Sequence, residues 1–380
     1  MALSVRASRT MHSRGAAFLE DRSIRIPEIY REALGLQLGS FIKVQQRDGS
    51  NLILQVSKAY NEDVAAECYS AYVTEDIYKL IHNEPQIKII PDVMLGCDPE
   101  FFLVNPQNGY IVHAGKYFQK WERMGHDGTI AELRPDPNPD ATVVVSNIRN
   151  LLKQGRARIN KANDRHVRMI SSSSYNGITA GFHIHFGMPP EMLGTDHVVY
   201  RINSQIIQLL DYYVGLPCII QEGIHDTARR CTTLVPYGKA GDFRLDWRTL
   251  EYRVPGGAML RHPKLAAGLI STAAVVVESA IIKVKELTGD FKNMTAADKG
   301  ELIRLYQNVP GLMGLYGLIC VPNIDGAMAH LDIILDDIRK MEGYERRAAS
   351  IEGFFQYLPQ VVSNDLEHNW DLEAKEVTFH

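Results

Sequence analysis

The chain has 380 residues, of which 45% are hydrophobic and 23% are charged. These proportions are typical of an ordinary soluble globular protein, with room for one large and one small domain, and they exclude a disordered chain. The formal net charge of -4 argues against a protein that coats nucleic acid or is drawn to a membrane surface by charge.

Cysteine usage and apolar segments bear on the compartment. The five cysteines are scattered, and no pair has the spacing of a zinc site or a redox motif, so a reducing cytoplasm is expected. The N-terminus carries arginines without a following apolar segment, unlike a secretory signal. The most apolar stretch, Leu265 to Ile282, contains Glu278 and several Ser and Thr residues. It predicts a buried helix rather than a membrane span.

The chain begins with residues 1–20, which lack periodicity and are expected to form an arm. A small β-rich domain is expected over residues 21–87. It starts as strand, short helix closed by Gly35, turn and strand, and the Asp48-Gly49 turn leads into a further strand. Residues 71–81 read as a half-repeat of the same strand and helix.

This N-terminal unit resembles the AbrB-type transition-state regulators, which are swapped-hairpin proteins. The resemblance rests on a strand, an Ile26-Pro27 step, a helix and the Leu38-Gly39 turn. In those regulators the fold dimerises and binds DNA. No basic surface is evident between Ile24 and Ile81, so packing on the rest of the chain or an oligomer contact is favoured over DNA binding.

The rest of the chain divides into a core and a helical part. Residues 88–262 are expected to form an α+β catalytic core in which strands alternate with longer helical segments. Residues 263–380 are expected to be mostly helical. Helices are predicted over residues 147–161, 196–213, 264–287, 295–307, 324–341 and 344–357.

Four short stretches of this core place two charged or metal-binding residues at positions i and i+2. Each stretch alternates with apolar residues, as a strand does, and residues two apart on a strand share a face. The polar members are therefore predicted to line one concave sheet surface that faces ions and a ligand. The four pairs are Asp98/Glu100, Glu132/Arg134, His183/His185 and Glu251/Arg253.

These residues also have purely structural explanations. An exposed edge strand would show two acids like Asp98 and Glu100, and Asp127 lies in a standard Asp-Gly turn. A single histidine on an apolar face would usually be structural. Two on one face, flanked by Gly181 and Gly187, favour ligation instead, because the glycines let a ligand approach the backbone. The last cluster could be an exposed ion-pair face, and it comprises Arg244, Arg248, Glu251 and Arg253.

Electrostatics favour a metal site over these alternatives. Carboxylates about 4 Å apart repel by roughly 4 kcal/mol at an effective dielectric of about 20. Five acids converging on one cleft therefore need cations. Two divalent ions would neutralise them, and the arginines would offset the phosphates of a nucleotide, as in phosphoryl transfer. The five acids are Asp98, Glu100, Asp127, Glu132 and Glu251.

Taken in order, four motifs resemble the phage-type amidoligases, which are carboxylate–amine ligases of the glutamine synthetase-like superfamily. The resemblance implies a curved antiparallel sheet with helices behind it, and ATP-dependent formation of an amide or peptide bond through an acyl phosphate. If the chain is phage-encoded, its compartment is the host cytoplasm. The motifs are Gly-Cys-Asp-Pro-Glu-Phe-Phe (96–102), Asp-Gly-Thr-Ile-Ala-Glu-Leu-Arg-Pro (127–135), Gly-Phe-His-Ile-His-Phe-Gly (181–187) and Leu-Glu-Tyr-Arg-Val-Pro-Gly (250–256).

The resemblance implies two Mg²⁺ sites, for which Mn²⁺ is an alternative ion. One set of ligands would be Glu100, Asp127 and Glu132. The set nearer ATP would be Asp98, His183 and Glu251. Glutamine synthetases carry Glu at the position of Asp98, so the shorter side chain here shifts the ion or admits a water.

The resemblance also implies roles for the remaining polar residues. Arg134 would contact the carboxylate substrate. Contacts to the nucleotide phosphates and to the developing acyl phosphate would come from His185, Arg244, Arg248 and Arg253.

Three other functions remain open from the sequence. A guanidino-type phosphotransferase shares the curved-sheet architecture, and a zinc hydrolase could use His183 and His185. A non-catalytic phage structural or DNA-binding protein would rely on the N-terminal unit alone. For the ligase, the expected partners are a small-molecule or peptide carboxylate and an amine. Neither a membrane nor nucleic acid is expected, and a homo-oligomer could form through the N-terminal domain.

Overall fold

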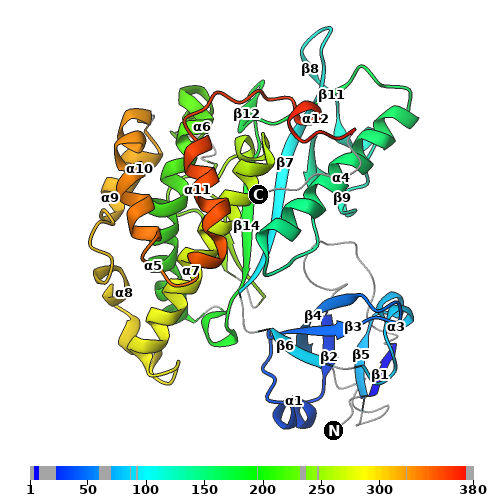
Figure 1. The fold of residues 1–380 in the computed structure, drawn as a ribbon, viewed down its shortest axis with the longest axis vertical. Coiled ribbons are helices and arrows are strands. Elements are labelled where there is room, and N and C mark those ends of the chain that lie inside the picture. The colour runs from blue at the N-terminus through cyan, green and yellow to red at the C-terminus, as the bar shows by residue number, and fades with distance from the viewer. Residues whose placement is uncertain are drawn as a thin grey trace.

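Two β-sheets organise the chain (Figure 1). The computed structural model describes residues 4–7, 23–59, 70–85, 87–90, 93–194, 196–231, 237–245, 248–321 and 323–373. A six-stranded sheet is formed within residues 4–90, and an eight-stranded sheet is formed within residues 94–252, with helices packed against it. The predicted α+β class with a small β-rich N-terminal sheet is confirmed.

The N-terminal sheet has the strand order β1-β5-β2-β4-β3-β6. The predicted succession of strand, short helix, turn and strand is present, and Gly35, with φ +65°, follows the helix as expected. The strand and the helix of the predicted half-repeat are β5 and α3. The elements are β1 (Ser4–Ala7), β2 (Ser23–Ile26), α1 (Glu28–Ala33), β3 (Phe41–Gln45), β4 (Asn51–Lys58), β5 (Ser70–Val73), α3 (Glu75–Leu80) and β6 (Ile87–Ile90).

Part of the predicted arm belongs to this sheet. Strand β1 pairs in parallel with β5 along its whole length. Val5 is buried in the N-terminal core, and Val5 N donates to Asn83 O at 2.7 Å. The expectation of an arm fails here because four residues are too few to show a period. Residues 8–20 of that segment lie outside the described residues.

The larger sheet has the strand order β15-β16-β14-β7-β10-β9, and every pair is antiparallel, as predicted. Strands β8 and β11 pair with the far end of β7. The strands are β7 (Met94–Asn105), β8 (Tyr110–Ile111), β9 (Met124–Asp127), β10 (Ile130–Leu133), β11 (Arg168–Ile170), β14 (Phe182–Gly187), β15 (Phe243–Leu245) and β16 (Leu250–Tyr252), with a separate hairpin of β12 (Ser174–Tyr175) and β13 (Ile178–Thr179).

Most of the longer helices agree with the sequence pattern. Asp140 and Asp196 cap the starts of α4 and α5 by accepting backbone N–H groups. The helix predicted over residues 295–307 is wrong as a continuous element, because Lys299 and Gly300 have positive φ and interrupt it. The helices are α4 (Ala141–Lys161), α5 (His197–Leu210), α6 (Leu216–Thr227), α7 (Pro263–Thr288), α8 (Glu301–Arg304), α9 (Leu312–Ile319), α10 (Ile324–Ile338), α11 (Ala348–Tyr357) and α12 (Leu366–Asn369).

Helix α7 is the central helix of the core. It is long and apolar enough to cross a membrane by composition, but 94% of its most apolar window is buried inside the protein. A helix that is apolar on all sides requires such surroundings. The prediction of a buried helix over this stretch is therefore confirmed.

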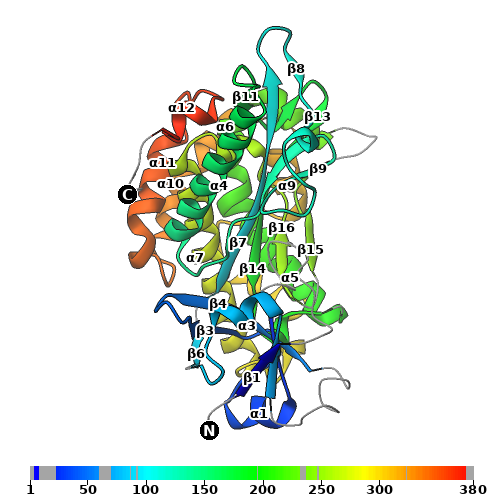
Figure 2. The ribbon, with the colours of Figure 1, turned by 90° about the vertical axis from the view of Figure 1, so that its right-hand side faces the viewer.

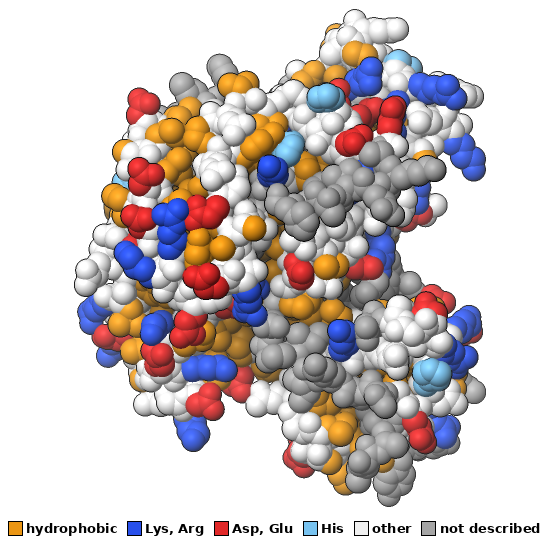
Figure 3. Space-filling view, in the orientation of Figure 1, with side chains coloured by type: hydrophobic (Ala, Val, Ile, Leu, Met, Phe, Trp, Pro, Cys, Tyr) orange, Lys and Arg blue, Asp and Glu red, His pale blue; other side chains and the backbone are white. Residues whose placement is uncertain are grey.

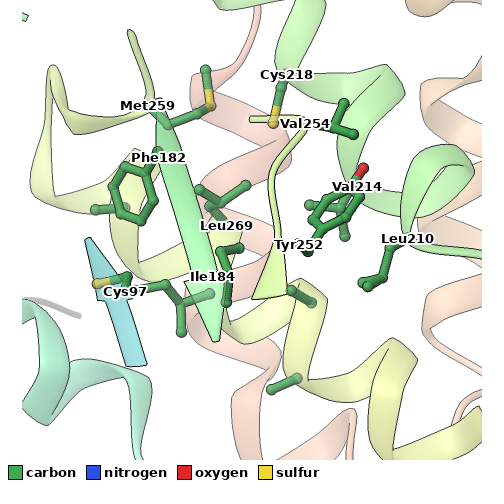
Figure 4. Packing of buried hydrophobic residues seen from close by; sticks show 14 of the residues in the cluster. Cys97, Phe182, Ile184, Leu210, Val214, Cys218, Tyr252, Val254, Met259 and Leu269 are labelled. Atoms are coloured by element: carbon green, nitrogen blue, oxygen red, sulfur yellow. The ribbon is translucent and has the colours of Figure 1, made fainter. Parts of the chain in front are cut away.

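The alternation along the strands sorts side chains onto two faces of the large sheet. On β7, Cys97 and Phe101 belong to the main core, as do Phe182 and Ile184 of β14 and Tyr252 of β16. Figure 4 shows this packing, with Leu269 of α7 and Leu210 of α5 close to the strands. Figure 2 shows helices α4, α7, α10 and α11 on the same side of β7 and β14. The opposite face carries the polar residues.

The N-terminal sheet packs against one end of the large sheet. Phe41 of β3 clusters with Met94 at the start of β7, and a Cβ on Gly187 would lie 2.1 Å from the Phe41 ring. Gln55 of β4 donates to Arg248 O at 3.3 Å.

In the space-filling view, acidic and basic side chains are interspersed over the helical part of the surface (Figure 3).

Candidate active site

The strand register places the predicted polar residues on one face of the large sheet. Directly paired residues point to the same face, and His183 is paired with Asp98, Glu251 with His185, and Glu132 with Glu100. Strand β15 adds Arg244 opposite Glu251. The i, i+2 pairs from four separate stretches thus form a continuous polar surface across neighbouring strands.

The centre of this surface is a cluster of two acids and two histidines. Asp98 Oδ1 lies 3.2 Å from His185 Nε2 and 3.7 Å from His183 Nδ1. Glu251 Oε1 lies 3.5 Å from the same His183 Nδ1. The side chains of Glu251 and His183 are only 6% and 7% exposed, whereas those of Asp98 and His185 are 20% and 17% exposed. The cluster is therefore accessible mainly from the Asp98 and His185 side.

These groups shift one another's ionisation. Burial opposes ionisation of Asp98, but the positive charges of the nearby His185 and His183 outweigh it, so the pKa of Asp98 is held below its usual value. Burial also opposes protonation of His183, but the surrounding carboxylates outweigh it and raise the pKa of His183. Protons and a divalent cation would therefore compete for the same atoms.

Glu100 connects to this cluster through a tyrosine. Its Oε2 accepts the Gly181 N–H at 2.6 Å and lies 3.0 Å from the Tyr237 hydroxyl, which is also 2.9 Å from His183 Nε2. Burial is the main reason that the pKa of Glu100 is raised. Tyr237 was not among the site residues predicted from the sequence.

Arg134, which was expected to contact the substrate carboxylate, binds other groups of the chain. Its Nη2 is bound to Glu132 Oε2, and its Nη1 donates to Lys120 O at 3.0 Å and to Glu122 O at 2.9 Å. Arg134 is buried, and burial lowers its pKa although nearby acids oppose that shift. The guanidinium therefore holds Glu132 and the 120–122 loop in place.

Asp127 stands at the edge of the polar surface. It is the last residue of β9, is exposed, and is paired with Ile130, which shares the face of Glu132. Its charge reaches Arg134, since it is one of the acids that support the protonated guanidinium. It is the most peripheral of the five predicted acids.

Two of the remaining arginines lie beside Glu251. Arg244 Nη1 lies 3.2 Å from Glu251 Oε2, and Arg253 Nε lies 3.4 Å from Glu251 Oε1. Arg244 is exposed and Arg253 is half-buried. Arg248 lies in the segment before β16 and is half-buried. Two positive groups thus flank Glu251, and Arg248 lies three residues before it in the chain.

The donor set fits a divalent cation. One ligand atom each of Asp98, His185 and Glu251 lie within 4.8 Å of one another. Two carboxylates at that separation repel by about 3–4 kcal/mol at a dielectric of about 20, which a bound cation would relieve. Carboxylate oxygens suit Mg²⁺, and an imidazole nitrogen in the set suits Mn²⁺ as well.

Residues 95–314 match the model of a family described as phage phiEco32-like COOH.NH2 ligase-type 2. The match covers more than half of the chain and includes every residue of the polar surface. The chain belongs to this family. It is therefore an enzyme of the carboxylate–amine ligase type, which forms C–N bonds. No curated protein matched the ligase.

Several solved structures align with the ligase at low identity. "Apo GmaS without ligand" is 13% identical with a TM-score of 0.42, and the match covers 82% of this chain and 79% of that one. A bifunctional glutathione synthetase from Pasteurella multocida is 10% identical with a TM-score of 0.41, covering 74% and 48%. A structure titled "novel glutamine synthase homolog" is 11% identical with a TM-score of 0.38, covering 87% and 82%.

A buried ion cluster behind the site was not predicted from the sequence. Glu222 binds Arg230 at 2.5 and 2.7 Å and Arg229 at 3.3 Å, and the three side chains are at most 1% exposed. Arg229 also donates to Tyr237 O, and Glu222 accepts the N–H of Gly256. The cluster therefore fixes the Tyr237 loop of the ligase against the segment that follows β16.

Asp211 is a second buried acid that sequence reasoning missed. It accepts the Tyr252 hydroxyl at 3.0 Å and the Gly241 N–H at 2.7 Å, and so it joins β16 to the 237–242 loop. Burial raises its pKa from 3.8 to about 7. The folded ligase therefore binds a proton here that the unfolded chain releases at lower pH.

We expect the ligase to lose stability as pH rises from 5 to 7 because of Asp211. The stability gained from the neutral carboxyl is present below the unfolded pKa and is lost as pH rises through the folded pKa of about 7. Relative to Asp211→Asn, which stays neutral, the wild-type free energy of unfolding should fall by about 2–3 kcal/mol between pH 5 and pH 8. Urea denaturation of both proteins measures this difference. A difference that is constant with pH would contradict the assignment.

Proposed function

We propose that this ligase uses ATP to join a carboxylate and an amine through an acyl phosphate, at a site that holds two divalent cations. The observation that carries the proposal is the convergence of Asp98, His185 and Glu251 on one sheet face beside Arg244 and Arg253. A carboxylate is a poor electrophile and needs activation before an amine can attack it. Such activation requires acids that bind cations, next to arginines that bind phosphates.

The first proposed cation site comprises Asp98, His183 and Glu251, with His185 as a further donor. The second comprises Glu100 and Glu132, with Asp127 at its outer edge. The two sets are neighbours on the sheet. Glu132 is paired with Glu100, and Glu100 is two residues from Asp98 on the same strand. Mg²⁺ is the expected ion, with Mn²⁺ as an alternative. When bound, such cations would neutralise charge on the phosphates of ATP.

The chain's own residues would bind and orient the reactants. Arg244 and Arg253 lie next to Glu251, and together with Arg248 they would bind phosphate oxygens. His185 lies at the more open side of the cluster, where the nucleotide would enter. We assign Arg134 to the support of Glu132 rather than to the substrate carboxylate, since three of its five N–H donors bind Glu132 and the carbonyls of Lys120 and Glu122.

The proposed reaction has two steps. A carboxylate oxygen of the substrate attacks the γ-phosphorus of ATP, the bond to the bridging β,γ-oxygen breaks, and ADP leaves. The amine nitrogen then attacks the carbonyl carbon of the acyl phosphate, inorganic phosphate leaves, and the nitrogen gives up one proton. The positive groups around Glu251 stabilise the charge on the transferred phosphoryl group without a protein nucleophile.

The proposed substrates are a small-molecule or peptide carboxylate and an amine. The proposed compartment is the cytoplasm, and neither a membrane nor nucleic acid is a proposed partner. For the N-terminal sheet we propose a supporting role. Gln55 binds the backbone of Arg248 and Phe41 packs at the ends of β7 and β14. A homo-oligomer contact through the same sheet is part of the proposal.

Incubation of the pure protein with Mg²⁺, ATP and a panel of acids and amines tests this function. We expect phosphate release, and an amide product by mass spectrometry, only when ATP, a divalent cation, an acid and an amine are all present. Amide formation without ATP would contradict the proposal. Phosphate release at a rate that no pair of acid and amine changes would also contradict the proposal.

A further inference from the structure

The hydroxyl of Tyr237 lies between Glu100, which belongs to one proposed cation site, and His183, which belongs to the other. It is 3.0 Å from Glu100 Oε2 and 2.9 Å from His183 Nε2. A phenol has one proton, so it can donate to only one of these two atoms. Glu100 Oε2 already accepts the Gly181 N–H at 2.6 Å, which identifies it as an acceptor oxygen. Tyr237 therefore donates to Glu100, and its oxygen accepts a hydrogen bond from the Nε2–H of His183.

This assignment determines which nitrogen of His183 carries hydrogen. Donation to Tyr237 requires a proton on Nε2. In the neutral imidazole, Nδ1 then has a lone pair, and Nδ1 faces Asp98 Oδ1 at 3.7 Å and Glu251 Oε1 at 3.5 Å. Three acceptor atoms facing one another favour a cation among them.

We propose that Tyr237 is a positioning residue that holds His183 in the Nε2–H tautomer and directs Nδ1 at a cation shared with Asp98 and Glu251. This inference deepens the proposed function and rests on it. Because Tyr237 also binds Glu100, the same hydroxyl fixes one donor of each proposed cation site relative to the other.

The local structure leaves room for this hydroxyl and little else. A Cβ on Gly181 would lie 2.4 Å from His183 Nε2 and 2.9 Å from the Tyr237 oxygen, so only glycine fits there. Gly181 also supplies the N–H that binds Glu100. The glycine before the two histidines thus serves the tyrosine bridge as well as the close approach of a ligand.

The buried ion cluster fixes Tyr237 itself. Arg229 Nη1 donates to Tyr237 O at 2.8 Å, and the guanidinium carbon lies 5.6 Å from the centre of the Tyr237 ring. Arg230 Nε donates to Gly238 O at 2.6 Å. Both arginines are held by Glu222, whose side chain is fully buried. Backbone and ring are therefore placed from outside the cation sites.

Cation binding by Tyr237→Phe tests the proposal without the reaction. Mn²⁺ is titrated into the cation-free full-length protein and followed by electron paramagnetic resonance, with thermal denaturation of the cation-free protein as the check on folding. We expect Mn²⁺ affinity to fall by about 10- to 100-fold, as for loss of other groups that orient a ligand. The matched control is Tyr213→Phe, because the hydroxyl of the buried Tyr213 likewise donates to a carboxylate, that of Asp337, at 3.2 Å.

The outcomes separate the two proposals. Wild-type affinity in Tyr237→Phe would overturn the role of Tyr237 and leave the cation site in place. Failure of the wild-type protein to bind Mn²⁺ would overturn the cation site and this inference with it. If Tyr237→Phe does not fold, ¹⁵N spectra of the histidine rings in the Mg²⁺-loaded wild-type protein decide. A proton on Nε2 of His183 supports the proposal, and a proton on Nδ1 alone overturns it.

Discussion

Replacing Glu251 with Gln is expected to reduce ATP-dependent amide formation by on the order of 10²–10³-fold. The carboxylate of Glu251 faces His183 at 3.5 Å, Arg244 at 3.2 Å and Arg253 at 3.4 Å. Gln keeps the size of the side chain but removes the negative charge that a cation needs. The rate is measured as released phosphate together with the amide product.

Glu352→Gln is the matched control for this variant. Glu352 is an acid held by an arginine fork at 2.8 and 2.9 Å, but it lies on α11, outside the polar surface. We expect its activity to match the wild type. A normal rate in Glu251→Gln would rule out a catalytic role for the cluster. Glu132→Ala is a poorer test, since it would leave Arg134 buried and without its carboxylate.

Replacing Glu222 with Gln is expected to lower the free energy of unfolding by about 3–5 kcal/mol. Glu222 is the shared carboxylate partner of Arg229 and Arg230, and all three side chains are almost fully buried. Gln would leave two guanidinium groups without a counter-ion in the interior, which costs more than the pair contributes when intact. Guanidinium chloride denaturation, followed by circular dichroism, measures the change.

An exposed acid provides the comparison. Glu301 pairs with Arg304 at 2.6 Å on the surface of α8, and its side chain is 42% exposed. Glu301→Gln should change stability by less than about 1 kcal/mol, as is usual for surface pairs. Equal effects of the two substitutions would show that the Glu222 cluster contributes no more than a surface ion pair.

The polar face was predictable because its signal is local. Asp98 and Glu100, or His183 and His185, need only the two-residue period of a strand to share a side. The apolar neighbours, such as Cys97 and Ile184, then had to face the helices, and they do. The antiparallel order followed from the family resemblance and not from the period itself, which carries no information about neighbouring strands.

What the sequence could not supply were partners distant along the chain. Tyr237 reaches His183 across 54 positions and Glu100 across 137, and nothing near any of them signals the contact. Arg134 has the spacing of a ligand-facing residue, yet its donors turn toward Glu132 and two backbone carbonyls. The period of a strand predicts which face a side chain lies on, but the groups that it contacts depend on loops. No short sequence pattern predicts how those loops fold.

In the helical part, too, some elements were predictable from the sequence and others were not. Helix α7 was recognisable from its apolar run, whereas α6 and α9 were not predicted. Helix α6 follows a π-helical turn at Asp211–Gly215 and contains Gly223 with φ +70°, so its residues keep no regular period. Such turns often occur at functional sites, and here Asp211 within the turn binds the loop that carries Tyr237.

Crystals of the protein grown with Mn²⁺ and a non-hydrolysable ATP analogue test the central claim most directly. Anomalous diffraction locates manganese without reference to activity. We predict two manganese peaks on the polar face, one among Asp98, His183 and Glu251 and one beside Glu100 and Glu132, with the phosphates next to Arg244 and Arg253. Nucleotide bound elsewhere, with no manganese at these acids, would contradict it.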